Sequence, residues 1–132
     1  MSKILKHIDK IAREKQRDAL FIDFRPSVTE EYQDFKPRKE LLSWLNEHGI
    51  SYEECGPIAS EYGWERYRGQ IYIDLPFDQS NEKYKLLDKH LMTDDNKFKI
   101  EGVEFYYIPL DIAMKNAHHD EPGFWEKWAE DF

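Results

Sequence analysis

The order of its predicted elements constrains the fold of this 132-residue chain more than any other feature. Between about Ala19 and Ile108, the hydrophobic pattern changes repeatedly between the two-residue period of strands and the 3.6-residue period of helices. The resulting order is strand, helix, strand, strand, helix, strand. The strands are expected at Ala19–Phe24, Ile50–Cys55, Gln70–Leu75 and Val103–Ile108.

Local signals indicate where the two intervening helices begin and end. Pro37 fits the first turn of one helix, and Gly49 ends it because glycine readily adopts the left-handed backbone conformation. Ser80 or Asn81 can cap the second helix. This order of elements predicts an α+β fold, specifically a ferredoxin-like βαββαβ sandwich in which both helices pack on one antiparallel sheet.

The length favours a single domain, 1–132, with its core at 19–108 and a helical segment on either side. Apolar residues at helical spacing predict an amphipathic helix over 2–16, with Arg13 among the basic residues on its solvated side. A helical extension is expected over 111–132, where Asp111 and Asp120 can each cap a short helix.

Charge and cysteine content restrict the classes of partner and site. The net charge of −8 repels phosphate backbones, so direct binding of nucleic acid is disfavoured and a basic protein partner is favoured. Cys55 has no second cysteine for a disulfide or a thiolate metal cluster, which fits a reducing compartment. No apolar run approaches the roughly 20 residues of a membrane span, and we expect a cytoplasmic protein that does not bind membranes.

Successive side chains on a strand point to opposite faces, which divides the residues of the predicted sheet into two sets. One face is mostly aliphatic and is expected to pack on the two helices; its residues are Leu20, Ile22, Phe24, Ile71, Ile73, Leu75, Val103, Phe105 and Tyr107. The other face carries rings and carboxylates: Phe21, Tyr72 and Tyr106 with Asp23, Asp74 and Glu104. RNA-binding sheets combine such rings with Lys and Arg, so the acidic residues argue against RNA. The rings are either covered by the terminal segments or open to a partner.

The carboxylates also support an alternative function. Asp23 and Asp74 on adjacent strands, with Glu104 as a third ligand, would hold Mg²⁺ or Mn²⁺ for phosphoryl transfer or hydrolysis. No glycine-rich phosphate loop or basic cluster accompanies them, so the sequence favours neither a metal nor another cofactor. The run from His118 to Glu121 is better explained as a solvated helix end, and Cys55 as a buried structural thiol.

The connection from Gly56 to Gly69 is too long for a tight hairpin and holds residue types that dominate binding hot spots. Its candidate partner-binding residues are Glu61, Tyr62, Trp64, Glu65 and Tyr67.

We therefore expect a small, acidic, non-catalytic binding protein of the bacterial immunity, antitoxin or inhibitor kind. Complementary charge would steer it to a basic partner, such as a toxin or nuclease domain, and a few aromatic side chains would hold the complex. A homodimer formed through an open sheet edge or the C-terminal aromatic residues is a further alternative.

Overall fold

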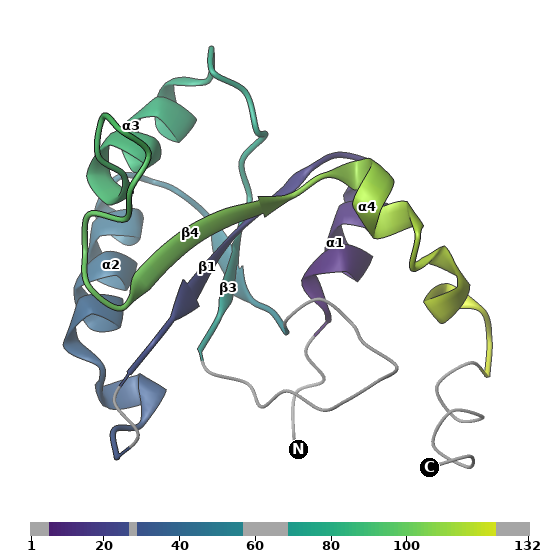
Figure 1. Ribbon diagram of the computed structural model, residues 1–132, viewed down its shortest axis with the longest axis horizontal. Coiled ribbons are helices and arrows are strands. Elements are labelled where there is room, and N and C mark those ends of the chain that lie inside the picture. Colours follow the sequence, from purple (N-terminus) through teal and green to yellow (C-terminus); the bar gives the residue numbers. More distant parts are fainter. Residues whose placement is uncertain (1–5, 27–28, 57–68, 124–132) are drawn as a thin grey trace.

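The computed structural model describes residues 6–26, 29–56 and 69–123, and a four-stranded antiparallel sheet lies at its centre (Figure 1). The strands are β1 (Ala19–Phe24), β2 (Tyr52–Glu54), β3 (Ile71–Ile73) and β4 (Val103–Ile108), in the order β2-β3-β1-β4. The mixed α+β class is confirmed. The bounds of β1 and β4 match the prediction, whereas β2 and β3 are shorter than the predicted strands.

Two helices, α2 (Lys36–Glu47) and α3 (Glu82–Leu91), cover one face of the sheet (Figure 1). Gly49 follows α2 with a φ of 66°, as its predicted role requires. The side chain of Asn81 caps α3 by accepting a hydrogen bond of 2.9 Å from the backbone N–H of Tyr84. Both helix ends therefore follow from local sequence signals.

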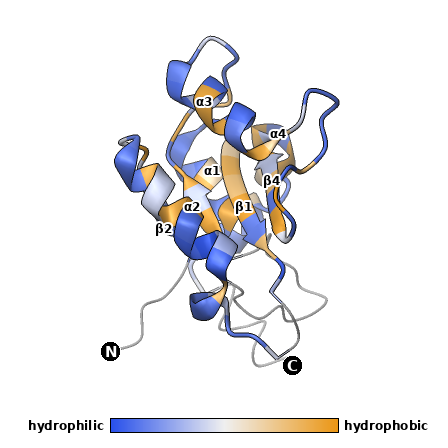
Figure 2. Cartoon of the chain, turned by 90° about the vertical axis from the view of Figure 1, so that its left-hand side faces the viewer, coloured by the Kyte–Doolittle hydropathy of each residue, from blue (hydrophilic) through white to orange (hydrophobic). Residues whose placement is uncertain are grey.

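The aliphatic side chains of the strands and the inner faces of α2 and α3 form the main core. Figure 2 shows the hydrophobic residues of β1 lying behind these helices. The alternation predicted from the sequence is correct on this face, because every buried strand residue of the core belongs to the predicted aliphatic set. These residues are Leu20, Ile22, Phe24, Ile71, Ile73 and Val103, and Leu75, which follows β3, joins them in the core.

The opposite face is covered by α1 (Ile8–Lys15) and α4 (Leu110–Met114), so the helices lie on both sides of the sheet (Figure 1). Two 3₁₀ helices, η1 (Tyr32–Asp34) and η2 (Ala117–Asp120), complete the described elements. The N-terminal helix, predicted over 2–16, begins at Ile8 within the described residues. His7 precedes it with extended backbone and forms a parallel bridge with Gly56. Within the described ranges, none of the helices combines the length and apolarity needed to cross a membrane.

A buried ion network joins α1 to the C-terminal segment, and it corrects the prediction that Arg13 lies on a solvated face. Arg13 is 6% exposed and Asp9 is fully buried. The guanidinium donates to Asp9 (2.9 Å), to the backbone oxygen of Ala113 (3.0 Å) and, through two nitrogens, to Asp120 (2.7 and 2.8 Å). Asn116 also donates to Asp9 (3.0 Å).

The two predicted caps of the C-terminal extension are also corrected. Pro109 occupies the N-cap of α4, and Asp111 lies in its first turn. Asp120 ends η2 and binds Arg13, since the carboxylate neutralises a guanidinium that is otherwise shielded from water. This contact lowers the pKa of the Asp120 carboxyl. The aromatic residues expected at 124–132 lie outside the described residues.

Replacing Arg13 with methionine is expected to lower the free energy of unfolding by about 3 kcal/mol, because it removes the guanidinium that pairs with the buried Asp9 carboxylate. Urea unfolding followed by circular dichroism measures the change. Glu14→Ala is the matched control, since it breaks the exposed pair with Lys6 and should cost less than about 1 kcal/mol. Equal, small losses for both variants would contradict the structural role of Arg13.

Candidate functional site

The structure describes only part of the predicted binding surface. The candidate residues Glu61, Tyr62, Trp64, Glu65 and Tyr67 lie outside the described residues. The described candidates for a site lie on the sheet, at its edges and in the segments that border it.

The three rings predicted on one sheet face lie opposite one another on neighbouring strands, and they differ in how far α1 covers them. Tyr72 is 1% exposed beneath α1, which is the arrangement expected where a terminal segment covers the ring. The Tyr72 hydroxyl accepts a hydrogen bond from Arg17 (3.0 Å) and donates one to Asp74 (3.0 Å). Phe21 is half-buried and its ring centre lies 5.5 Å from that of Tyr106. Tyr106 is 38% exposed and remains accessible.

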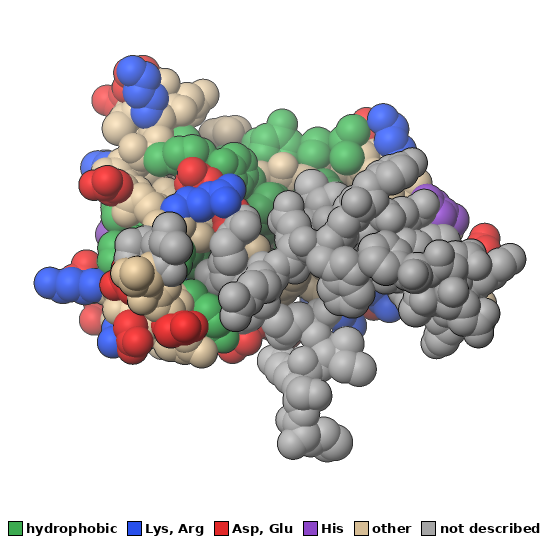
Figure 3. Space-filling model, turned by 60° about the horizontal axis from the view of Figure 1, so that its bottom comes forward, with side chains coloured by type: hydrophobic (Ala, Val, Ile, Leu, Met, Phe, Trp, Pro, Cys, Tyr) green, Lys and Arg blue, Asp and Glu red, His purple; other side chains and the backbone are tan. Residues whose placement is uncertain are grey.

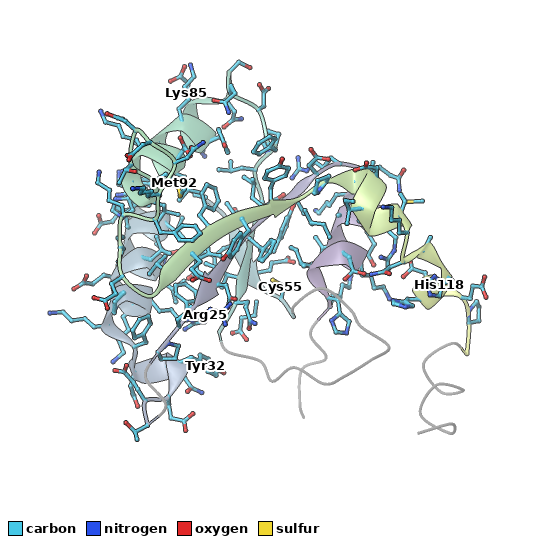
Figure 4. The ribbon with its side chains drawn as sticks, viewed as in Figure 1. Arg25, Tyr32, Cys55, Lys85, Met92 and His118 are labelled. Atoms are coloured by element: carbon cyan, nitrogen blue, oxygen red, sulfur yellow. The ribbon has the colours of Figure 1, made fainter. Side chains whose placement is uncertain are left out.

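The antiparallel register brings together two of the three candidate metal-binding carboxylates. Asp23 lies opposite Glu104, and Arg25 contacts both at 3.1 Å (Figure 4). Asp74 directly follows Ile73, which pairs with Leu20, so it lies toward the other end of β1 from Asp23. Arg17 holds Asp74 at 2.8 Å.

The other candidate metal ligands are also occupied by contacts within the protein. Asp120 binds Arg13, and the ring centres of His118 and His119 lie 4.3 Å apart in an edge-to-face arrangement. In the part of the chain that the structure describes, no group of three or more His, Cys, Asp or Glu residues is arranged to hold a metal ion.

Cys55 is fully buried in the core beneath α1 (Figure 4). Burial raises the pKa of its thiol to about 12, because the thiolate is poorly stabilised away from water. A thiol in this position has neither the access nor the ionisation that a nucleophile requires.

Exposed aromatic side chains instead gather at the outer edge of β4. Phe77, Phe98, Tyr106 and Tyr107 are 37–46% exposed. The rings of Phe77 and Tyr107 stack with centres 4.1 Å apart, and Phe98 meets Tyr106 edge-to-face at 5.5 Å. Figure 3 shows hydrophobic side chains gathered along the upper margin of one face of the molecule, with charged side chains below them.

These rings border a groove of about 470 Å³ between β4 and α3, called here the β4–α3 groove. Tyr84 and Asp88 of α3, Phe105 of β4 and Met92 after α3 also line it. The labelled Met92 in Figure 4 marks the end of α3 beside this groove. Its lining therefore combines aromatic rings with polar side chains.

The backbone of β4 also has an open side at this groove. Arg25 donates from its backbone N–H to the backbone oxygen of Gly102 at 2.8 Å, in the same register as the β1–β4 pairs. Because hydrogen-bonded and non-bonded pairs alternate, the backbone groups of Phe105 and Tyr107 must point away from β1. Among the described strands, β4 is at the end of the sheet, so no strand pairs with that side.

Asp88 supplies a carboxylate to the groove. It is half-buried, and the described residues form no ion pair with it. The negative charge of Asp88 also acts on Tyr84. Burial is the main cause that raises the pKa of the Tyr84 hydroxyl, and the charge of Asp88 raises it further. The groove therefore offers negative charge next to aromatic rings.

Sequence reasoning missed this groove for identifiable reasons. Phe77 and Phe98 lie in connecting segments, where strand or helix periodicity cannot assign a face. Tyr107 was placed on the aliphatic face by alternation, yet it is 46% exposed because β4 is an edge strand. A signal was available in the predicted ferredoxin-like fold. Its first and third strands are neighbours at the centre of the sheet, so its last strand lies at an edge.

Comparisons with protein-family models, with curated proteins and with solved structures returned no significant match to this chain.

Cys55 in the native protein should react with iodoacetamide at pH 8 at least about a thousandfold more slowly than an ordinary thiol of pKa about 8.5, because its thiolate is that much scarcer and is shielded. Mass spectrometry of timed samples measures labelling, and the urea-unfolded chain is the control. Rapid labelling before unfolding would show that Cys55 is accessible.

Proposed function

We propose that this chain is a non-catalytic protein-binding module that holds a basic protein partner at the β4–α3 groove. The observation that carries the proposal is the open edge of β4, bordered by the exposed rings of Phe77, Phe98, Tyr106 and Tyr107. An edge strand with exposed apolar side chains is a template for pairing with another chain, and soluble proteins usually protect such edges.

The aromatic side chains suit a binding role because they offer large contact areas with few rotatable bonds. Tyr and other rings are enriched among the few interface residues that supply most of the binding energy. The stacked pair of Phe77 and Tyr107 is already ordered in this structure, so little conformational entropy would be lost on binding.

The net charge of −8 supports a basic partner, since complementary charge accelerates encounter. An acidic protein of this kind needs no catalytic group to block a basic cleft, and we infer a bacterial immunity, antitoxin or inhibitor protein that acts on a toxin or nuclease domain. The same proposal places it in the cytoplasm, where the free thiol of Cys55 would stay reduced.

We further infer that the core adopts the ferredoxin-like arrangement. Support comes from the order of the antiparallel strands. Read from the other edge, it is β4-β1-β3-β2, with β1 and β3 at the centre and β4 and β2 at the edges. The positions of α2 and α3 on one face also fit, since each connects two parallel strands across an intervening antiparallel strand. The rival metal enzyme has less support, because Asp74 lies apart from Asp23 and Glu104.

Tyr107→Ser should reduce recovery of the partner at least about tenfold, because it removes a hot-spot ring from the β4–α3 groove. The measurement is capture from host extract by the tagged chain, followed by quantitative mass spectrometry. Ile112→Ser is the matched control, because Ile112 is also exposed (40%) but lies on α4 outside the groove.

Recovery of one basic protein by the wild type and by Ile112→Ser, but not by Tyr107→Ser, would support the proposal. Equal recovery by both variants would place the interface elsewhere, and a partner without basic character would contradict the inferred charge complementarity. A doubled mass of the purified chain, abolished by Tyr107→Ser, would instead show that the edge pairs with a second copy.

Charge reversal at Glu61 and Glu65 tests the role predicted for the connection before β3. Association of the double Lys variant with the recovered basic partner should be slower than that of the wild type, and the difference should shrink as salt is raised. Stopped-flow measurements at two ionic strengths give the rates. An unchanged rate at low salt would remove these residues from the proposed interface.

A further inference from the structure

We propose that the β4–α3 groove is a recognition pocket for one arginine side chain of the partner, presented by an extended segment that lies along β4. This inference rests on the proposed function and specifies the chemistry by which the partner is recognised. It follows from three features of the groove: a carboxylate that forms no ion pair with the described residues, aromatic walls, and a strand edge with which none of the described strands pairs.

The carboxylate of Asp88 favours a cationic occupant. It is half-buried and lines the groove together with aromatic side chains, so a cation bound there would lie beside a negative charge. The neighbouring lysines of the described chain make other contacts: Lys85 pairs with Glu82 at 3.8 Å, and Lys99 donates to the backbone oxygen of Lys89 at 3.2 Å. A cation from a partner would supply the missing charge.

The aromatic walls favour arginine over lysine. A planar guanidinium can lie over a ring while it donates two hydrogen bonds to a carboxylate, whereas an ammonium group is a compact and strongly hydrated charge. This protein already holds one guanidinium over rings, since Arg38 lies over those of Tyr32 (5.1 Å) and Phe24 (5.7 Å) while it donates to the backbone oxygen of Gly69 (3.1 Å).

The shape of the groove indicates how the arginine is delivered. Its volume of about 470 Å³ lies within the usual range of ligand pockets, roughly 300–1,000 Å³, and leaves room beside one side chain. The outward backbone groups of Phe105 and Tyr107 run along it. An extended segment can bond to these groups by strand addition and direct alternate side chains into the groove.

The test compares two capped nine-residue peptides of threonine and serine, one with a central arginine and one with citrulline, which has nearly the same shape without the charge. Isothermal titration calorimetry measures their affinities for the full chain. The arginine peptide should bind at least about tenfold more tightly, and Asp88→Asn should reduce that preference to less than twofold.

Asp34→Asn is the matched control, because it removes one exposed carboxylate from η1, outside the groove, and should preserve the preference. Tyr107→Leu provides a second variant that keeps an apolar side chain, and it should weaken binding of the arginine peptide by removing the ring. Urea unfolding of each variant verifies that it is folded.

Equal affinity for the two peptides, or a preference that persists in Asp88→Asn, would overturn the inference. Failure of the wild type to bind either peptide at millimolar concentration would also overturn it. The proposed function is judged separately: a basic partner lost on Tyr107→Ser but held without a preference for arginine would leave that function standing and remove only the arginine pocket.

Discussion

The ion network around Arg13 determines which surfaces of the sheet remain available. A fully buried carboxylate such as Asp9 is tolerated only with a positive partner, and Arg13 provides that charge while also binding Asp120 from the C-terminal segment. The network therefore fixes α1 and the segment after α4 to each other across the second face of the sheet. With both faces covered by helices, Tyr72 is buried, and the accessible rings are displaced to the edge.

The two edges of the described sheet then differ in their protection. Beyond β2, the chain continues to Gly56, which donates from its backbone N–H to the backbone oxygen of Lys6 (2.8 Å) and accepts from Ile8 (3.2 Å). The entry to α1 thus covers the end of that edge. Among the described strands, none pairs with the outer side of β4, and exposed side chains and the β4–α3 groove lie there. This asymmetry is why the proposed interface lies at β4.

The elements of the fold were predictable because their signals are local. Alternation placed β1 and β4, Gly49 ended α2, and the side chain of Asn81 capped α3. The site was less predictable, because it depends on contacts between distant segments. Helical spacing put Arg13 among solvated lysines, and nothing in its neighbours reveals that Asp120, over a hundred residues later, would bind it. Likewise, alternation assigns a face to Tyr107 but not whether a helix covers it.

The arginines of the described chain show which side chains hold a guanidinium in this protein. Arg17 binds the Tyr72 hydroxyl and Asp74, Arg25 lies between two carboxylates, and Arg38 lies over two rings. Each is held by carboxylates, rings or both, within the protein. Asp88 and the rings beside it offer the same combination, yet no arginine of the described chain contacts Asp88. In the proposed complex, an arginine of the partner would complete this combination of a carboxylate and rings.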